Sequence, residues 1–351
     1  MPLLAAIALG ATLGRKPGTV VLVIVALLLA GSVLAAVHHA EVVAHYVGEP
    51  MGSVILAVAV TVIEVGLIVT LMSSGGDDAA TLGRDTVFAA VMITANGIVG
   101  LSLLVGVARQ HVVSFGAAGI SAAQSTVATL ATLTLVLPAF TTSTPGPQFS
   151  TAQLVFASVA SIALYALFVF VQTVRHRDYF LPEDEDDHAR TEEAHAAPPT
   201  RSVALVSLAV LVVALADVVG LAKVESKPIE DAVASVGAPQ SAVGVVIALL
   251  VLMPETLAAV RNAARGRVQI SLNLAYGSAM ASIGLTIPVL AVASIWLAPP
   301  LELGLGPTEL VLLAITFITG ALTAPLGQAT VQQSGVRLVL FAAFLVLAVF
   351  P

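Results

Sequence analysis

Residues 53–72 read SVILAVAVTVIEVGLIVTLM, an apolar run with a single charged residue, Glu64. The hydrocarbon core of a bilayer is about 30 Å thick and takes roughly 20 apolar residues in helical form, so this run predicts a membrane-spanning helix. The composition extends that prediction to the whole chain. Of the 351 residues, 58% are hydrophobic and only 10% are charged, whereas soluble proteins carry about a quarter charged residues. A water-soluble protein is therefore excluded.

Nine further runs of similar length and character occur along the chain. A helix satisfies its own backbone amides in lipid, and the strict alternation typical of a membrane β-barrel is missing here. The ten runs cover residues 19–37, 53–72, 86–107, 120–140, 152–174, 202–221, 242–260, 270–290, 309–329 and 336–350. Residues 2–13 are apolar but short, and we interpret them as a shortened leading helix. The sequence thus predicts an all-α, polytopic membrane protein with about 11 transmembrane helices.

One polar segment divides these helices into two groups. Seven of the 21 acidic residues lie between Glu183 and Glu193, which predicts a solvated acidic linker over residues 175–201. It separates a leading helix (1–14) and five helices (15–174) from five more (202–351). Two copies of an odd-numbered unit must cross the membrane in opposite senses, which is the inverted-repeat arrangement of many transporters. Both halves carry Gly-x-Pro ahead of the second helix and one glutamate within it.

The distribution of basic residues predicts the orientation. If residues 2–13 span the membrane, the loops on the linker side hold nine Lys and Arg residues and the opposite loops hold five. Cytoplasmic loops carry the excess of basic residues, so the linker is predicted to be cytoplasmic and the C-terminus external. The lipid bilayer is the expected environment. Because no basic stripe occurs, nucleic acid is not expected as a partner, and the sequence leaves open whether the chain forms a homo-oligomer.

Two glutamates, Glu64 and Glu255, are the strongest candidates for chemistry. Glu64 lies near the middle of its run, and intramembrane acids mark ion paths by default. Glu255 follows Pro254, which should kink the helix and free a carbonyl oxygen beside the acid. Burial favours the protonated form of a carboxylic acid, so such groups can bind either a proton or a cation. A purely structural role, in which each acid pairs with arginine or backbone, is the alternative.

A calcium ion takes six to eight oxygen ligands, so two carboxylates would need neutral oxygens beside them. Side chains that could supply these oxygens are Asn96, Ser102, Asn273, Ser278 and Ser282. Carbonyl groups could also be exposed where Gly97 and Gly277 weaken their helices. Close packing of helices is the alternative explanation for these small residues.

Two further polar groups could serve ion traffic. His39, Glu41 and His45 cluster at the end of one helix and could relay protons, since histidine titrates near neutrality; an interfacial polar cap is the alternative. The acidic linker could attract cations, and its densest part is Glu183, Asp184, Glu185, Asp186 and Asp187. A solvated spacer would have the same composition. Hydrolase and phosphate-loop motifs are missing from the sequence, so we expect no enzymatic activity and no cofactor.

Two longer runs resemble a known family. Residues 39–52 (HAEVVAHYVGEPMG) and 273–288 (NLAYGSAMASIGLTIP) are similar to the bacterial calcium/proton antiporters of the CAX family, within the cation/calcium exchanger superfamily. The resemblance implies two inverted five-helix repeats after an extra leading helix, a location in the inner membrane of a bacterium, and a central site in which Glu64 and Glu255 bind calcium or protons. It also implies sodium or potassium exchange for protons in some bacterial members. The family places Gly-Asn four and three residues before each central glutamate, whereas this chain has Val60-Thr61 and Val251-Leu252.

The sequence therefore predicts an antiporter that exports calcium in exchange for protons by alternating access. A sodium or potassium/proton antiporter that uses the same two acids is the first alternative. A passive cation channel lined by these acids is an alternative of another class. The sequence does not discriminate among these ions, and it gives no stoichiometry.

Overall fold

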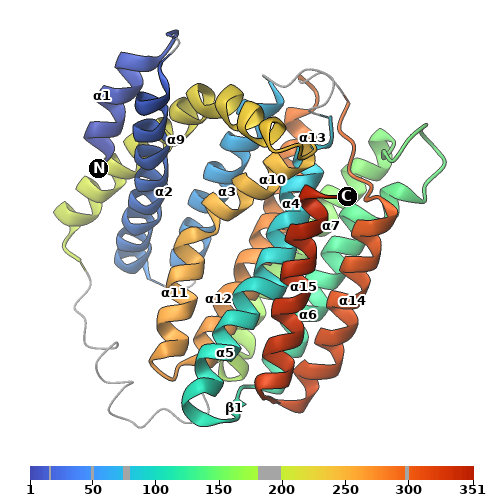
Figure 1. The fold of residues 1–351 in the computed structure, drawn as a ribbon. Helices are drawn as coiled ribbons and strands as arrows, with labels where there is room; N and C mark the ends of the chain where they lie inside the picture. Colours follow the sequence, from blue (N-terminus) through green and yellow to red (C-terminus); the bar gives the residue numbers. More distant parts are fainter. Residues whose placement is uncertain (16, 49–50, 74–79, 181–198, 297–299) are drawn as a thin grey trace.

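The computed structural model describes residues 1–15, 17–48, 51–73, 80–180, 199–296 and 300–351. Over these residues the chain is almost entirely helical, and most helices run side by side along the long axis of the molecule (Figure 1). The α-helices are α1 (Pro2–Thr12), α2 (Thr19–Val47), α3 (Met51–Met72), α4 (Leu82–Met92), α5 (Val99–Gln110), α6 (Ala117–Ala131), α7 (Thr151–Phe170), α9 (Arg201–Ser235), α10 (Ser241–Val251), α11 (Met253–Ala264), α12 (Val268–Ala281), α13 (Ile287–Ala293), α14 (Pro307–Thr323) and α15 (Val331–Val349). Two short strands, β1 (Val113–Ser114) and β2 (Gln328–Ala329), pair antiparallel.

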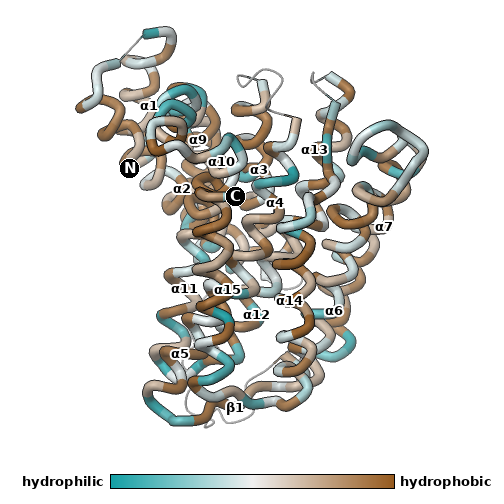
Figure 2. The backbone as a smooth tube through the Cα atoms, turned by 45° about the vertical axis from the view of Figure 1, so that its right-hand side comes forward, coloured by the Kyte–Doolittle hydropathy of each residue, from teal (hydrophilic) through white to brown (hydrophobic). Residues whose placement is uncertain are grey.

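The helices confirm the all-α polytopic membrane fold. In the described part of the chain, nine helices are long and apolar enough to cross a membrane, and α10 with α11 makes a tenth if this bent pair is one span. Each of the ten runs predicted from the sequence falls on one of these helices or on the bent pair. Apolar residues predominate along the shafts of the helices, and polar residues gather mainly at their ends (Figure 2). α1 is a shorter apolar helix, so a span by this segment stays a prediction.

α9 is longer than the sequence run predicted. The apolar run was expected to end near residue 221, but the helix continues to Ser235 and contains Pro228. Its polar extension carries charged side chains at helical spacing: Lys227 Nζ lies 2.9 Å from Asp231 Oδ1 and 3.8 Å from Glu230 Oε2. Pairs at i+3 and i+4 support an exposed helix. Hydropathy alone does not detect such an extension.

The predicted span 242–260 is broken in the middle. α10 ends at Val251 and α11 begins at Met253, with a bend of 52° between them. Pro254, the second residue of α11, lacks the amide hydrogen that would continue the helical ladder, and its ring crowds the preceding turn. The bend places Glu255 in the first turn of α11.

Four of the described membrane spans contain π-helical segments, in which extra residues widen the turn: η3 (Thr132–Val136) follows α6, η5 (Val171–Arg175) follows α7, and the other two lie inside longer helices. η2 (Ile93–Ile98) joins α4 to α5 in one continuous helix over Leu82–Gln110, and η7 (Ser282–Thr286) joins α12 to α13 over Val268–Ala293. The first of these helices is the most buried membrane span in the described chain. π-Helical turns shift the register of a helix face and often occur at functional sites.

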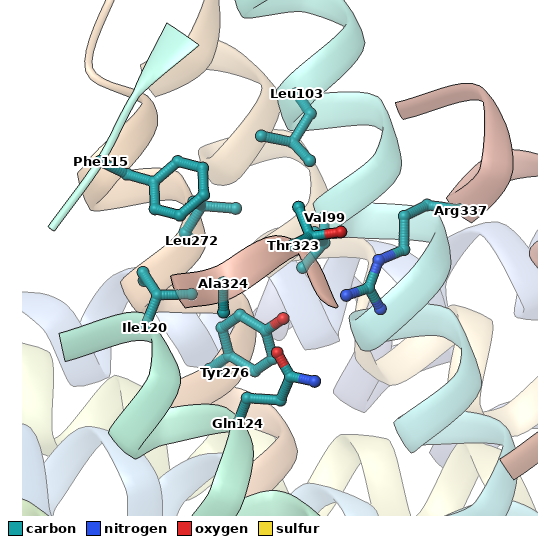
Figure 3. Close-up of a pocket in the computed structure, with 10 residues that line it drawn as sticks. All are labelled: Val99, Leu103, Phe115, Ile120, Gln124, Leu272, Tyr276, Thr323, Ala324 and Arg337. Atoms are coloured by element: carbon teal, nitrogen blue, oxygen red, sulfur yellow. The ribbon is translucent and has the colours of Figure 1, made fainter. Parts of the chain in front are cut away.

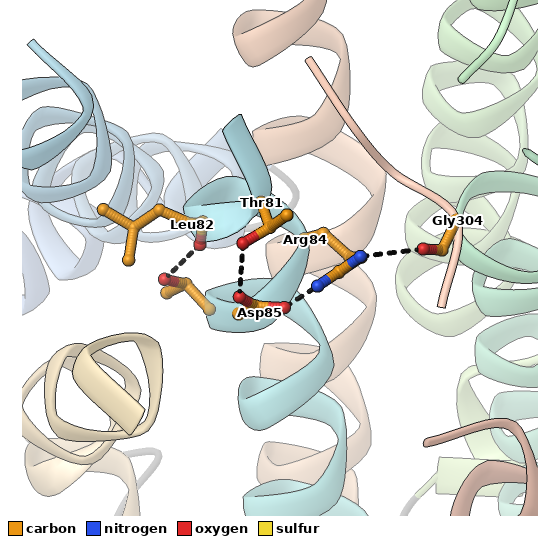
Figure 4. A network of polar contacts seen from close by, with 6 residues as sticks. Thr81, Leu82, Arg84, Asp85 and Gly304 are labelled. Atoms are coloured by element: carbon orange, nitrogen blue, oxygen red, sulfur yellow. Dashed lines mark hydrogen bonds and ion pairs between the residues drawn. The ribbon is translucent and has the colours of Figure 1, made fainter. Parts of the chain in front are cut away.

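A polar network fixes the end of α4 opposite the β1–β2 pair. Thr81 donates a hydrogen bond to Asp85 Oδ2 (2.9 Å), and Arg84 Nε donates to Asp85 Oδ1 (2.8 Å). Arg84 Nη1 also donates to the carbonyl of Gly304 (3.0 Å) (Figure 4). Gly304 belongs to an extended segment whose Leu301, Leu303 and Leu305 are buried. The network therefore attaches this segment to the start of α4.

Candidate functional site

Glu64 lies inside the helix bundle and contacts the other half of the sequence. Only 3% of it is exposed. Ser282 donates a hydrogen bond to Glu64 Oε1, and Thr286 donates to Oε2 at 2.8 Å. The two hydroxyls are four residues apart in η7, so they lie on one face of that helix. Burial disfavours the ionised form of this carboxyl group, and the donors to both oxygens offset part of that cost.

Glu255 has a different environment, although it is also buried. It is 7% exposed, and its Oε2 atom has no hydrogen-bond partner among the described residues. The carboxyl groups of Glu64 and Glu41 both interact electrostatically with it. The two central acids are therefore neighbours, but one is held by two hydroxyls while the other has a free acceptor oxygen.

A cavity of about 300 Å³ reaches Glu255 from between α3, α7 and α12. Most of its lining is apolar, and its polar residues include Asn273, Ser278 and Gln172. Gly277 also lines it, and a Cβ atom added there would meet no described atom within 4 Å. We had expected Gly277 to weaken its helix. It instead lies within regular α12, where its missing side chain leaves space open, and the irregular segment begins five residues later at Ser282.

The two asparagines predicted as ligands both donate hydrogen bonds to other segments of the chain. Asn96, within η2, donates to Thr316 Oγ1 of α14 at 2.9 Å, and its Oδ1 atom is buried with no partner in the described chain. Asn273 donates to the carbonyl of Phe180 at 2.6 Å and accepts a hydrogen bond from Gln269 Nε2 at 2.9 Å. Each amide thus fixes a contact between segments.

The serines and Gly97, which the sequence analysis also proposed as sources of oxygen ligands, lie in different surroundings. Ser282 binds Glu64 directly, and Ser278 lines the cavity. Ser102 is fully buried in α5, and its hydroxyl has no partner among the residues described. Gly97 lies in η2, so an irregular helix segment does occur there. Within the described chain, no group of three or more His, Asp or Glu side chains could hold a metal ion. Any cation at this position would need hydroxyl and carbonyl oxygens beside the two acids.

The predicted proton relay lies on α2. His38 and His39 have ring centroids 5.3 Å apart, and Glu41 interacts electrostatically with His38 as well as with Glu255. His45 is exposed one turn beyond Glu41. The structure therefore brings Glu41 within electrostatic range of Glu255. The acidic group Glu183–Asp187 lies outside the described residues.

Thr286 is the residue at this site that the sequence analysis missed. Its spacing of four residues from Ser282 was a usable signal, because both fall on the helix face that meets Glu64. Arg337 of α15 was also missed as a buried residue. Its Nη1 atom donates to the carbonyl of Ala95 in η2 at 2.9 Å. The sequence analysis had counted Arg337 only as one of the basic residues in the loops.

Comparison with known proteins decides the family. The model of the sodium/calcium exchanger protein family matches residues 17–174 and 206–350, most of the chain. The chain belongs to this family. It is 47% identical over 332 residues to the protein y4hA of Sinorhizobium fredii, with 95% of this chain and 89% of the relative covered. It is 34% identical over 317 residues to the sodium-potassium/proton antiporter ChaA of Escherichia coli, covering 90% and 84%.

The fold of this exchanger family member also matches solved structures. The H+/Ca2+ exchanger CAX aligns over 98% of this chain and 85% of its own, with a TM-score of 0.69 and 14% sequence identity. At this identity the likeness shows the shared fold alone. Family membership confirms the resemblance inferred from residues 39–52 and 273–288.

Proposed function

We propose that this exchanger is a proton-coupled antiporter that exports calcium in exchange for protons by alternating access. Glu64 and Glu255 would bind protons on one side of the membrane and the cation on the other. The observation that carries the proposal is the buried pair itself: two acids from α3 and α11, in different halves of the chain, close enough to interact electrostatically. Family membership supports an exchanger, and the fold shared with an H+/Ca2+ exchanger supports this choice of ions.

The coupling between cation export and proton uptake follows from the charge of the two carboxylates. Two carboxylates neutralise a divalent cation, and a bound cation expels the protons they would otherwise hold. Ser282 and Thr286 would lower the cost of ionising Glu64 when a cation arrives, because their hydroxyls donate to both of its oxygens. Glu255, which lines the cavity, would meet the arriving ion first. Serine hydroxyls and backbone carbonyls would complete the shell of oxygens.

The surrounding elements have matching roles in this proposal. Residues 15–174 and 202–351 would form two inverted five-helix repeats in a bacterial inner membrane, with the linker cytoplasmic and the C-terminus external. Glu183–Asp187 would attract cations to the cytoplasmic side. His39, Glu41 and His45 would carry protons towards Glu255, a route supported by the interaction of Glu41 with both His38 and Glu255.

A second candidate is exchange of sodium or potassium for protons at the same acids. The relative ChaA, whose name describes this exchange, supports it. So does Asn273, because its Oδ1 atom already accepts a hydrogen bond from Gln269, which leaves one oxygen fewer for calcium than the sequence predicted. Uptake of each ion, measured separately at one fixed pH gradient, discriminates between the two candidates.

Transport in proteoliposomes tests the proposal. With an imposed pH gradient, we expect calcium uptake by the wild-type protein and none by Glu64→Gln or Glu255→Gln, which keep the side-chain size but lose the charge. Asp231→Asn is the matched control, since this acid lies exposed near the end of α9. Unimpaired uptake in either glutamine variant would reject the assigned role. Flux that needs no proton gradient would instead favour a channel.

A further inference from the structure

The cavity that reaches Glu255 has walls that do not suit a metal ion alone. Its volume is about 300 Å³, and most of its lining is apolar, including Leu56 and Val60 of α3 and Leu274 of α12. A calcium ion takes six to eight oxygen ligands, and aliphatic side chains supply none. The walls therefore match a ligand that has an apolar part of its own.

The acid in this cavity has no basic partner. Glu255 is the one charged side chain among the described residues that line the cavity. It is 7% exposed, and the carboxyl groups of Glu64 and Glu41 interact electrostatically with it. The ion pairs of the described residues are those of Arg84 and Lys227, so no basic side chain there neutralises these acids. A buried carboxylate without a countercharge favours the binding of a cation.

The remaining lining residues suit an organic cation. Tyr165 and Phe168 of α7 contribute aromatic rings, whose faces attract ammonium groups and pack against apolar groups. Gln172, Asn273 and Ser278 add neutral polar groups to the lining. Apolar and aromatic walls with a few polar groups and one charge are typical of sites for small organic molecules.

The size of the cavity limits the ligand. Sites for small molecules measure about 300–1,000 Å³, so this cavity suits a single ring or a short chain. The pocket between Gln124 of α6 and Arg337 of α15 differs in size and in charge (Figure 3). Its volume of about 10 Å³ holds at most one water molecule, and its guanidinium group would repel a cation.

We propose that the cavity at Glu255 binds a small organic cation, namely a protonated primary amine on an aromatic or aliphatic body. The ammonium group would bind at Glu255, and the body would lie against the apolar side chains of α3, α7 and α12. Asn273, which lines the cavity, donates to the carbonyl of Phe180 just before the acidic linker. The amine would therefore enter from the linker side of the molecule.

A bound amine would block the exchange of calcium, because both cations need Glu255. This consequence rests on the proposed function, whereas the binding of the amine does not.

Calorimetric titration with 2-phenylethylamine tests the proposal. The full-length protein is held in lipid nanodiscs without metal cations, at a mildly alkaline pH at which carboxylic acids are ionised and primary amines are still protonated. Empty nanodiscs measure the partition of the amine into lipid. 2-Phenylethanol has the same body but a neutral hydroxyl group in place of the ammonium group. We expect saturable binding of the amine and binding of the alcohol that is weaker by about tenfold or more.

Two variants remove the site by different means. Glu255→Gln removes the charge, and Gly277→Leu fills the cavity, where an added Cβ atom would meet no described atom within 4 Å. Each should weaken binding of the amine by about tenfold or more. Asp231→Asn is the matched control, because it removes an exposed acid of α9, and it should bind the amine like the wild type.

Three outcomes would overturn the amine site. The first is the lack of saturable binding by the wild type. The second is equal binding of the alcohol, which would mean that the cavity takes any apolar chain, such as a lipid tail. The third is binding kept by either variant, which would place the amine elsewhere.

Added calcium separates this proposal from the proposed function. We expect calcium to weaken the binding of the amine to the wild type. An affinity for the amine that calcium leaves unchanged would overturn the block and the calcium site at Glu255, while binding that both variants lose would still support the amine site.

Discussion

The hydroxyl of Thr286 offers a sharp test of how Glu64 is controlled. Thr286→Val removes the donor that lies 2.8 Å from Glu64 Oε2 and nearly preserves side-chain size. A hydrogen bond to a charged group contributes about 1.5–3 kcal/mol. Because this bond favours the ionised carboxylate, its loss makes protons compete better with the cation. One pH unit corresponds to about 1.4 kcal/mol, so the pH for half-maximal uptake should rise by about one to two units.

The measurement is initial calcium uptake into proteoliposomes over a series of external pH values. Thr129→Val is the matched control, because the hydroxyl of Thr129 bonds to its own helix at Ser125 and is exposed. The control should keep the wild-type profile. A Thr286→Val profile superimposable on the wild type would refute the view that η7 sets the protonation of Glu64. A loss of uptake at every pH would mean that the hydroxyl binds the cation directly.

Three further substitutions test the fold and the cavity. Arg84→Ala removes the hydrogen bonds to Asp85 and Gly304 and should lower the free energy of unfolding by about 2 kcal/mol. This loss is measured as a lower unfolding midpoint. An unchanged midpoint would mean that the network does not stabilise the fold. Phe180→Ala removes a buried ring that packs edge to face against Phe168, with ring centroids 5.6 Å apart. It should lower the free energy of unfolding by about 3–5 kcal/mol in the same assay. A loss below about 1 kcal/mol would show that the ring is not packed in solution. Gly277→Leu should fold normally, since the added side chain enters the open cavity, yet it should slow uptake; wild-type uptake would exclude this cavity from the ion path.

The sequence predicted the helices well because lipid imposes a simple length rule. Runs of about twenty apolar residues gave the positions of ten spans, and Glu64 was recognised as the charged residue inside one of them. The extension of α9 was missed since its polar end depends on side-chain pairs such as Lys227 with Asp231. Local patterns of hydropathy contain no information about such pairs.

The site was predicted less completely, for reasons of geometry. Glu64 and Ser282 meet as neighbours, but Asn96 faces Thr316 and Asn273 faces Phe180. Which way an amide points depends on helix rotation, and the π-helical segments change that rotation by inserting residues into a turn. These contacts join residues that lie 93 to 220 positions apart in the sequence, so local sequence patterns do not predict them.

The most direct test of the central claim counts protons released as calcium binds. Calorimetric titrations of the purified protein in buffers of different ionisation enthalpy, repeated across pH, give that number. The account predicts up to two protons per calcium in the wild type, one for each acid, and fewer for both Glu64→Gln and Glu255→Gln. Calcium binding without any proton release at all pH values, or release unchanged in both variants, would contradict it.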